Sequence, residues 1–275
     1  MRKIICIANQ KGGVGKTTTA INLSASLAAA EKKTLLIDCD PQGNATSGVG
    51  IDRTSLSENN LYHVLIDNVR IEDAVFSTPM PMLDIIPSNQ DLIGVEVEFV
   101  TLQDREKRLK SVLKNLNSSY EYLVIDCPPS LGFLTVNSLA ASDFLIIPLQ
   151  CEYFAMEGLG QLLNTLKLTK THFNPSISLG GILLTMFDTR NRLSHRVADE
   201  VKKYFGTKVF KTVIHRNVRL SESPSHGLPI ILYDINCRGA ISYGTCTRNI
   251  IRWEDVDVEK RLARERPWSN IFRPH

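Results

Sequence analysis

The stretch Gln10-Lys11-Gly12-Gly13-Val14-Gly15-Lys16-Thr17-Thr18 decides how this chain folds. Residues 3–8, before it, form a short apolar run typical of a strand, and residues 17–30, after it, carry apolar side chains at helical spacing. A glycine-rich turn between a strand and a helix is the context that a phosphate-binding loop requires. The sequence therefore predicts a phosphate site at the first strand-to-helix connection.

The residue types of this loop suit a nucleoside triphosphate. Its glycines let the backbone curl until successive N–H groups converge on an anion, and the N-terminus of the following helix adds partial positive charge. Lys16 can then reach the β- and γ-phosphates, and the Thr17 hydroxyl can ligate Mg²⁺. We therefore expect ATP and Mg²⁺ as ligands. The predicted nucleotide contacts of the loop are Lys11, Gly12, Gly13, Val14, Gly15, Lys16, Thr17 and Thr18.

One position departs from the general pattern G-x-x-x-x-G-K-[ST]. Gln10 stands where that pattern has glycine, and Lys11 places a second lysine at the start of the loop. This lysine is either a solvated side chain beside a glycine turn or a second phosphate contact. The form K-G-G-x-G-K-[ST]-T resembles the deviant P-loop ATPases, a group that includes the ParA or Soj partition ATPases and the division-site protein MinD. The resemblance implies a catalytic role for Lys11, which would reach the nucleotide of a partner subunit in an ATP-dependent homodimer.

Two carboxylates lie at the end of the second apolar run, residues 34–38. Asp38 ends this run and Asp40 follows it, and ligands of open parallel sheets bind beyond the carboxyl ends of the strands. Both are expected to project toward the phosphate loop, and capping of the next turn is the alternative for either one. The motif D-x-D-P-Q-G-N-x-T resembles the segment that follows the deviant loop in partition ATPases. That resemblance implies that Asp40 orients the attacking water, with Lys11 and Lys16 as the other catalytic residues.

A third carboxylate, Asp126, ends the buried-strand pattern of residues 122–126. This is typical of a Walker B strand, whose aspartate holds Mg²⁺ directly or through water. A strand that merely happens to end in aspartate is the simpler alternative, and the phosphate loop favours the metal site. Thr17 and Asp126 are therefore the predicted metal ligands.

Apolar runs at residues 83–87, 144–149 and 179–188 predict further strands, and residues 102–116 and 157–168 have helical spacing. Because strands alternate with helices, we expect a single-domain α/β P-loop NTPase with a mostly parallel β-sheet flanked by helices on both faces. The deviant P-loop ATPase domain is expected to span residues 1–243. Gly244-Thr-Cys-Thr is expected to interrupt the last helix, so that residues 244–275 form a divergent C-terminal tail.

Positive charge concentrates in residues 186–220. Nine basic and three acidic side chains give this segment a net charge of +6, whereas the rest of the chain carries 23 basic and 26 acidic ones. A solvated helix face accounts for Lys202 and Lys203, but the whole concentration favours a polyanionic partner. The sequence has neither a helix-turn-helix signature nor an aromatic stacking array. We therefore expect non-specific backbone contacts with double-stranded DNA.

The segment of residues 213–229 resembles the part of partition ATPases that contacts the base and ribose and lies near their DNA-binding face. The resemblance implies nucleotide contacts from Arg216 and Asn217 and DNA contacts from Arg190 and Arg219. The family usually has proline where His215 stands in this chain.

Composition narrows the class of protein. Hydrophobic residues make up 43% and charged residues 22%, which predicts a large buried core. The six cysteines form no C-x-x-C pair, which indicates reduced thiols and argues against an iron–sulfur protein. No apolar run approaches the roughly 20 residues that span a bilayer. We expect no stable membrane insertion and a cytoplasmic, nucleoid-associated protein.

These observations predict an ATPase that segregates chromosomes or low-copy plasmids. Its ATP-induced sandwich dimer would bind DNA, and hydrolysis to ADP and phosphate would release it. A ParB/Spo0J-type centromere-binding partner is implied by the resemblance alone. The alternative is a MinD-like membrane-cycling ATPase for spatial regulation of cell division. It requires an amphipathic helix in residues 249–272, where acidic residues and Pro267 interrupt the apolar positions.

Overall fold

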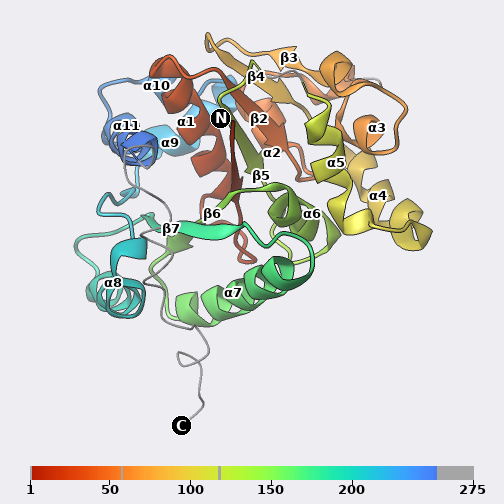
Figure 1. Cartoon of the computed structure of the whole chain (residues 1–275). Coiled ribbons are helices and arrows are strands. Elements are labelled where there is room, and N and C mark those ends of the chain that lie inside the picture. The colour runs from red at the N-terminus through yellow and green to blue at the C-terminus, as the bar shows by residue number, and fades with distance from the viewer. Residues whose placement is uncertain (1, 57, 117–118, 253–275) are drawn as a thin grey trace.

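Seven strands of the computed structural model form one sheet, in the order β3-β4-β2-β5-β1-β6-β7 (Figure 1). β3 pairs with β4 in the antiparallel direction, and the other neighbouring strands are parallel. The structure describes residues 2–56, 58–116 and 119–252. The strands are β1 (Lys3–Ile7), β2 (Thr34–Asp38), β3 (Phe76–Ser77), β4 (Leu83–Ile86), β5 (Tyr122–Asp126), β6 (Phe144–Gln150) and β7 (Ser178–Thr185).

Helices cover both faces of the sheet, so its central strands are apolar on both sides. In β5, Leu123 and Ile125 pack into one apolar core, and Tyr122 and Val124 pack into the other. The α-helices are α1 (Lys16–Ala29), α2 (Asn44–Gly48), α3 (Leu61–Leu65), α4 (Gly94–Glu98), α5 (Arg108–Lys114), α6 (Phe133–Ala141), α7 (Ala155–His172), α8 (Arg192–Phe205), α9 (Val218–Glu222), α10 (Ile230–Tyr233) and α11 (Arg238–Ile251). α1 and α11 belong to one core, and α6 and α7 belong to the other (Figure 1). The predicted fold class is confirmed.

The parallel register brings the candidate site together. β1 lies between β5 and β6, and Ile7 at the end of β1 is opposite Asp126 at the end of β5. Asp126 is in turn opposite Asp38 at the end of β2. The phosphate loop, which follows β1, therefore meets both carboxylates at one edge of the sheet.

The helix predicted over residues 102–116 is wrong at its start, because α5 begins at Arg108. Asp104 adopts a left-handed φ of 54°, which a continuous right-handed helix cannot contain. The side chain of Leu102 is 48% exposed and does not join the apolar stripe. Leu109 and Val112 do form the buried stripe of α5, as predicted.

The interruption predicted at Gly244 is also wrong, because α11 continues to Ile251. Tyr243, Cys246 and Ile250 form a buried stripe of α11 in the same core as α1. This packing outweighs the cost of about 1 kcal/mol that a glycine imposes inside a helix. The rest of the predicted tail, residues 253–275, lies outside the described residues.

Among the helices of the described residues, none has the length and apolar character needed to cross a membrane.

Candidate active site

Two glycines in left-handed backbone conformations shape the phosphate loop between β1 and α1. The φ angle is 73° at Gly13 and 86° at Gly15, a region that residues with a Cβ rarely adopt. Gly15 precedes the first residue of α1, so the loop turns directly into a helix N-terminus. The Thr185 hydroxyl, at the end of β7, donates to the Val14 carbonyl at 2.7 Å and holds the loop against the sheet. The predicted context of strand, glycine turn and helix is confirmed.

Lys16 is buried at the first position of α1. Its Nζ donates to the carbonyl of Lys11 at 3.0 Å, so the ammonium lies inside the curve of the loop. Burial lowers the pKa of Lys16, and the nearby Asp126 carboxylate opposes this shift. An ammonium with little competing water attracts a phosphate more strongly than a solvated one.

The two carboxylates after β2 have different partners. Oδ2 of the buried Asp38 accepts from the Thr46 N–H at 2.8 Å and from the Thr46 hydroxyl at 2.7 Å. Its Oδ1 accepts from the N–H of Asp40 at 3.1 Å, and burial raises the pKa of Asp38 to about 6. Asp38 therefore has the capping role. Asp40 accepts from the Gln42 N–H at 2.9 Å and lines the cleft at the phosphate loop.

Asp126 is fully buried at the end of β5, and neither carboxylate oxygen has a hydrogen-bond partner among the described residues. Burial raises the pKa of Asp126 well above its ordinary value; Asp38 adds to the shift and the nearby Thr17 hydroxyl opposes it. A buried carboxylate without a partner is costly unless a cation neutralises it. Thr17 and Asp126 therefore fit Mg²⁺, which typically takes one or two protein oxygens and fills its other positions with water and phosphate.

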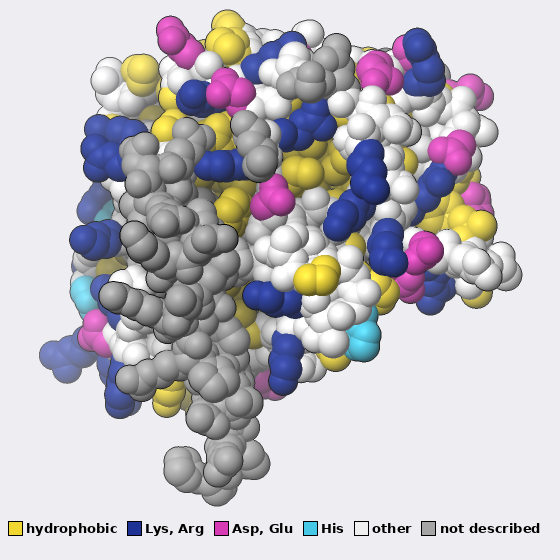
Figure 2. Space-filling model, viewed as in Figure 1, with side chains coloured by type: hydrophobic (Ala, Val, Ile, Leu, Met, Phe, Trp, Pro, Cys, Tyr) yellow, Lys and Arg dark blue, Asp and Glu magenta, His cyan; other side chains and the backbone are white. Residues whose placement is uncertain are grey.

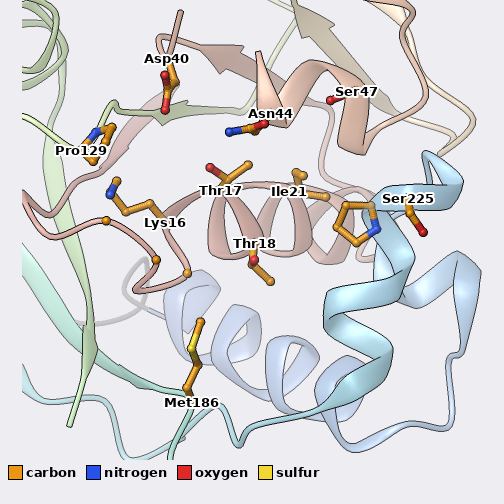
Figure 3. Close-up of a pocket in the computed structure, with 14 residues that line it drawn as sticks. Lys16, Thr17, Thr18, Ile21, Asp40, Asn44, Ser47, Pro129, Met186 and Ser225 are labelled. Carbon is orange, nitrogen blue, oxygen red and sulfur yellow. The ribbon is translucent and has the colours of Figure 1, made fainter. Parts of the chain in front are cut away.

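A cleft of about 560 Å³ extends over the phosphate loop and α1 (Figure 3). This volume lies in the range of small-molecule sites. Three of the predicted catalytic or metal-binding side chains line it, namely Lys16, Thr17 and Asp40. In Figure 3, Asp40 lies on one side of the loop and Met186 lies on the other.

Seven residues of the cleft lie outside the sequence-based prediction of the site: Ile21, Asn44, Ser47, Pro129, Met186, Pro224 and Ser225. Met186 follows β7 directly and adopts a left-handed φ of 48°, a strained conformation for a residue other than glycine. Its place beyond the carboxyl end of a parallel strand is a signal that can be read from the sequence. Pro224 and Ser225 belong to the segment of residues 213–229, for which the resemblance points to other residues.

Arg216 and Asn217 are not among the residues that line the cleft within the described ranges. The Asn217 Oδ1 accepts from the N–H of Arg219 at 2.8 Å and caps α9. The neighbouring His215 accepts from the Arg238 guanidinium at 2.7 Å, and burial together with this cation lowers the pKa of His215. The nucleotide contacts of Arg216 and Asn217 stay a prediction.

Lys11 pairs with a residue that the sequence-based prediction does not include. Its ammonium donates to the carboxylate of Glu152, in the connection between β6 and α7. The reach of Lys11 to the nucleotide of a partner subunit stays a prediction.

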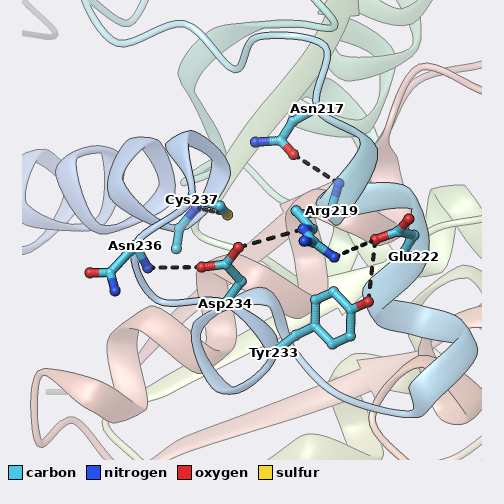
Figure 4. Close-up of polar contacts among 8 residues, drawn as sticks. Asn217, Arg219, Glu222, Tyr233, Asp234, Asn236 and Cys237 are labelled. Carbon is cyan, nitrogen blue, oxygen red and sulfur yellow. Dashed lines mark hydrogen bonds and ion pairs between the residues drawn. The ribbon is translucent and has the colours of Figure 1, made fainter.

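The two arginines predicted to contact DNA have different surroundings. The Arg190 side chain is 89% exposed and lies 3.3 Å from the Asp188 carboxylate of its own loop. The Arg219 guanidinium lies 3.1 Å from Glu222 and 3.6 Å from Asp234 (Figure 4). Two carboxylates therefore neutralise Arg219, and one neutralises Arg190.

Basic side chains gather on the face shown in Figure 2, toward the left where α8 and α11 lie in Figure 1, and again on the right near α5. The exposed basic residues of α8 are Arg192, Arg196, Lys202 and Lys203. α11 adds the exposed Arg238 and Arg248. Much of the charge concentrated in residues 186–220 is thus accessible to a partner.

The chain is similar to known proteins along most of its length. The chain matches a family model described as an AAA domain over residues 2–179. It is 55% identical over 243 residues to the sporulation initiation inhibitor protein Soj of Bacillus subtilis (strain 168), covering 88% of this chain and 96% of that protein. It is 52% identical over 259 residues to the chromosome partitioning protein ParA of Myxococcus xanthus (strain DK1622), covering 94% and 91%. Because this match is longer than 243 residues, it includes part of the segment expected to diverge.

A solved structure shares the fold. Cobyrinic acid a,c-diamide synthase from Mycobacterium smegmatis, with bound ADP and magnesium, matches with a TM-score of 0.81 and 34% identity. The match covers 92% of this chain and 96% of that one.

Proposed function

The chain belongs to the ParA/Soj family of chromosome-partitioning ATPases, and on this premise we propose that it converts ATP and water to ADP and phosphate, with Mg²⁺, to segregate DNA. The higher identity to the Soj and ParA proteins than to the diamide synthase supports partition over small-molecule synthesis. The observation that carries the chemistry is the convergence of Lys16, Thr17 and Asp40 on one cleft. The buried Asp126, whose carboxylate has no hydrogen-bond partner in the described part of the chain, lies nearby.

In this proposal the chain's own groups bind and orient the triphosphate. The N–H groups of the loop and the Lys16 ammonium hold the β- and γ-phosphates and stabilise the negative charge that builds up during transfer. Thr17 and Asp126 would hold Mg²⁺, which when bound would neutralise charge on the phosphates. Asp40 accepts a hydrogen bond from the attacking water and so orients it for reaction at the γ-phosphorus.

The proposal extends to a dimer that binds DNA. Each Lys11 would neutralise phosphate charge on the partner's nucleotide, so that ATP binding creates the dimer. Exposed basic residues of two subunits would then hold any duplex through its backbone, and Arg190 and Arg219 are the proposed contacts. Because each phosphate contact adds to the logarithm of affinity, doubling the patch strengthens binding far more than twofold. We also propose a ParB/Spo0J-type partner and a cytoplasmic, nucleoid-associated location, which the similarity to Soj and ParA supports.

Co-sedimentation tests this function against the membrane-cycling alternative. The chain is mixed with plasmid DNA or with anionic liposomes, each with ATP, with ADP and without nucleotide. We expect ATP-dependent sedimentation with DNA, whatever its sequence, and none with liposomes. The Lys16→Ala variant is the control. It should not sediment with DNA or with liposomes under any condition, because the phosphates lose their nearest cation. ATP-dependent sedimentation with liposomes but not with DNA would replace the proposal with the membrane-cycling function.

A further inference from the structure

Lys11 is held within its own chain by Glu152. The ammonium donates to the Glu152 carboxylate, and the two side chains are 39% and 46% exposed. The partners are 141 residues apart in the sequence, so the pair is a tertiary contact. Because both side chains are partly exposed, the lysine can exchange this carboxylate for another anion.

Both ends of the pair are fixed to β6. The buried Asn9 side chain donates to the Pro148 carbonyl at 2.7 Å and accepts from the N–H of Lys11 at 3.0 Å. The N–H of Glu152 donates to the Gln150 carbonyl at 2.9 Å. Both backbones are therefore held by one strand, which places the two side chains within reach of each other.

Lys16 and Glu152 both contact Lys11, the first at its backbone carbonyl and the second at its side chain. The Lys11 carbonyl accepts from Nζ of Lys16 at 3.0 Å, while the Lys11 ammonium contacts Glu152. A triphosphate bound to Lys16 would share this ammonium with the carbonyl, because an ammonium has three N–H donors. Lys16 therefore links a bound triphosphate to the residue that Glu152 holds.

Two large aromatic side chains follow Glu152 directly. Tyr153 is 77% exposed and Phe154 is 65% exposed, and their ring centroids lie 5.0 Å apart. Exposed aromatic side chains are typical of protein–protein contacts. A two-fold dimer uses the same patch on both subunits. Because Lys11 would cross to the partner at this place, the patch fits a second copy of this chain.

We propose that Glu152 is a latch that keeps Lys11 within its own subunit until the nucleotide of a partner subunit competes for it, and so limits dimerisation. This inference rests on the proposed ATP-dependent dimer. Each Lys11 must leave Glu152 before it can reach the partner's nucleotide, so two latches open for each dimer formed. A surface ion pair shifts an equilibrium by about 1.4- to fivefold. Two latches together therefore shift dimerisation by roughly two- to 25-fold.

The first arm of the test measures the latch without any nucleotide. The chain is treated with a trace of acetylating reagent, and acetylation of Lys11 is followed by peptide mass spectrometry. In the Glu152→Gln variant, Lys11 should react a few times faster, because no carboxylate holds its amine. The exposed Lys170 serves as the internal reference. Equal rates at Lys11 in the variant and the parent would overturn the latch, whether or not the chain dimerises.

The second arm measures dimerisation by sedimentation velocity with a non-hydrolysable ATP analogue. Glu152→Gln should dimerise at a protein concentration roughly two- to 25-fold lower than the parent. The matched control is Glu157→Gln, an equal loss of charge at an exposed residue of α7, which should behave like the parent.

The two arms separate this inference from the proposed function. Faster acetylation of Lys11 with unchanged or weaker dimerisation overturns the latch as a limit on dimerisation, and weaker dimerisation would identify Glu152 as a contact that the dimer needs. If the parent and both variants stay monomeric with the analogue, the proposed dimer fails and the latch has nothing to control. The acetylation arm still reports the ion pair in that case.

Discussion

Asp40 and Asp38 are two residues apart, yet only Asp40 lines the cleft. Asp40 accepts from the Gln42 N–H and is proposed to orient water, a contribution made in the transition state. We predict that Asp40→Ala lowers kcat by on the order of 10²-fold or more and leaves the affinity for ATP largely unchanged. Steady-state phosphate release and equilibrium binding of an ATP analogue measure the two effects.

Asp38→Asn is the comparison variant, because Asp38 holds the turn and α2 through Thr46. It should destabilise the fold by about 1–3 kcal/mol, since a buried acceptor of three hydrogen bonds is altered. Denaturant unfolding measures this effect. If Asp40→Ala hydrolyses ATP at the parental rate, another group must orient the water.

At the scale of elements, the packing of α11 on α1 includes one buried polar contact. The hydroxyls of Tyr243 and Thr19 lie 3.1 Å apart, and both residues are buried. We predict that Tyr243→Phe lowers the free energy of unfolding by about 1–2 kcal/mol, because the Thr19 hydroxyl loses this partner while the ring still fills its site. Urea unfolding should show a lower midpoint with an unchanged slope.

Ile241→Ala is the control for this contact, because Ile241 lies on the same helix and is 59% exposed. Its effect should stay within about 0.5 kcal/mol, as for most surface substitutions. An equal effect of the two substitutions would mean that the hydroxyl pair contributes nothing to the packing of α11.

The sequence predicts the strands better than the helices, for a physical reason. β5 is buried along its whole length, so its continuous apolar run marks the strand without ambiguity. The start of α5 depends on the left-handed backbone of Asp104, and the passage of α11 through Gly244 depends on packing against α1. The spacing of apolar residues contains neither effect.

Within the candidate site, too, the sequence predicts only some of the residues and contacts. The phosphate loop and Asp126 are recognisable because each follows or ends a strand that the sequence marks clearly. The partner of Lys11 cannot be recognised from the sequence, because Glu152 is 141 residues away and only the fold brings the two together. Periodicity also cannot distinguish Asp38 from Asp40, and their roles separate only when Thr46 is seen to bond to Asp38.

At the scale of the whole molecule, a modest net charge of +3 is distributed unevenly. Residues 186–220 carry more than this whole charge, and α8 exposes four basic side chains. Binding to the DNA backbone requires accessible positive charge. Ion pairs with nearby carboxylates weaken the attraction of such a charge for phosphate. Arg190 faces one carboxylate and Arg219 faces two.

We therefore predict that Arg190→Ala weakens ATP-dependent DNA binding more than Arg219→Ala does, and by the same factor for any duplex sequence. Each lost contact should flatten the log–log salt dependence by roughly 0.9, and a dimer would lose each contact twice. Glu222→Gln should instead strengthen binding, because it removes one of the carboxylates that neutralise Arg219. Fluorescence anisotropy with two unrelated duplexes, over a range of salt concentrations, measures all three variants.

Dimerisation with an ATP analogue is the control for these variants, because none of the three side chains is proposed to touch nucleotide. An affinity that falls mainly on one of the two duplexes would indicate base-specific contacts instead of backbone contacts. If Arg190→Ala and Arg219→Ala combined in one chain still allow dimerisation and leave the salt slope unchanged, both arginines belong to a solvated surface. The exposed basic side chains of α8 would then be the next positions to replace.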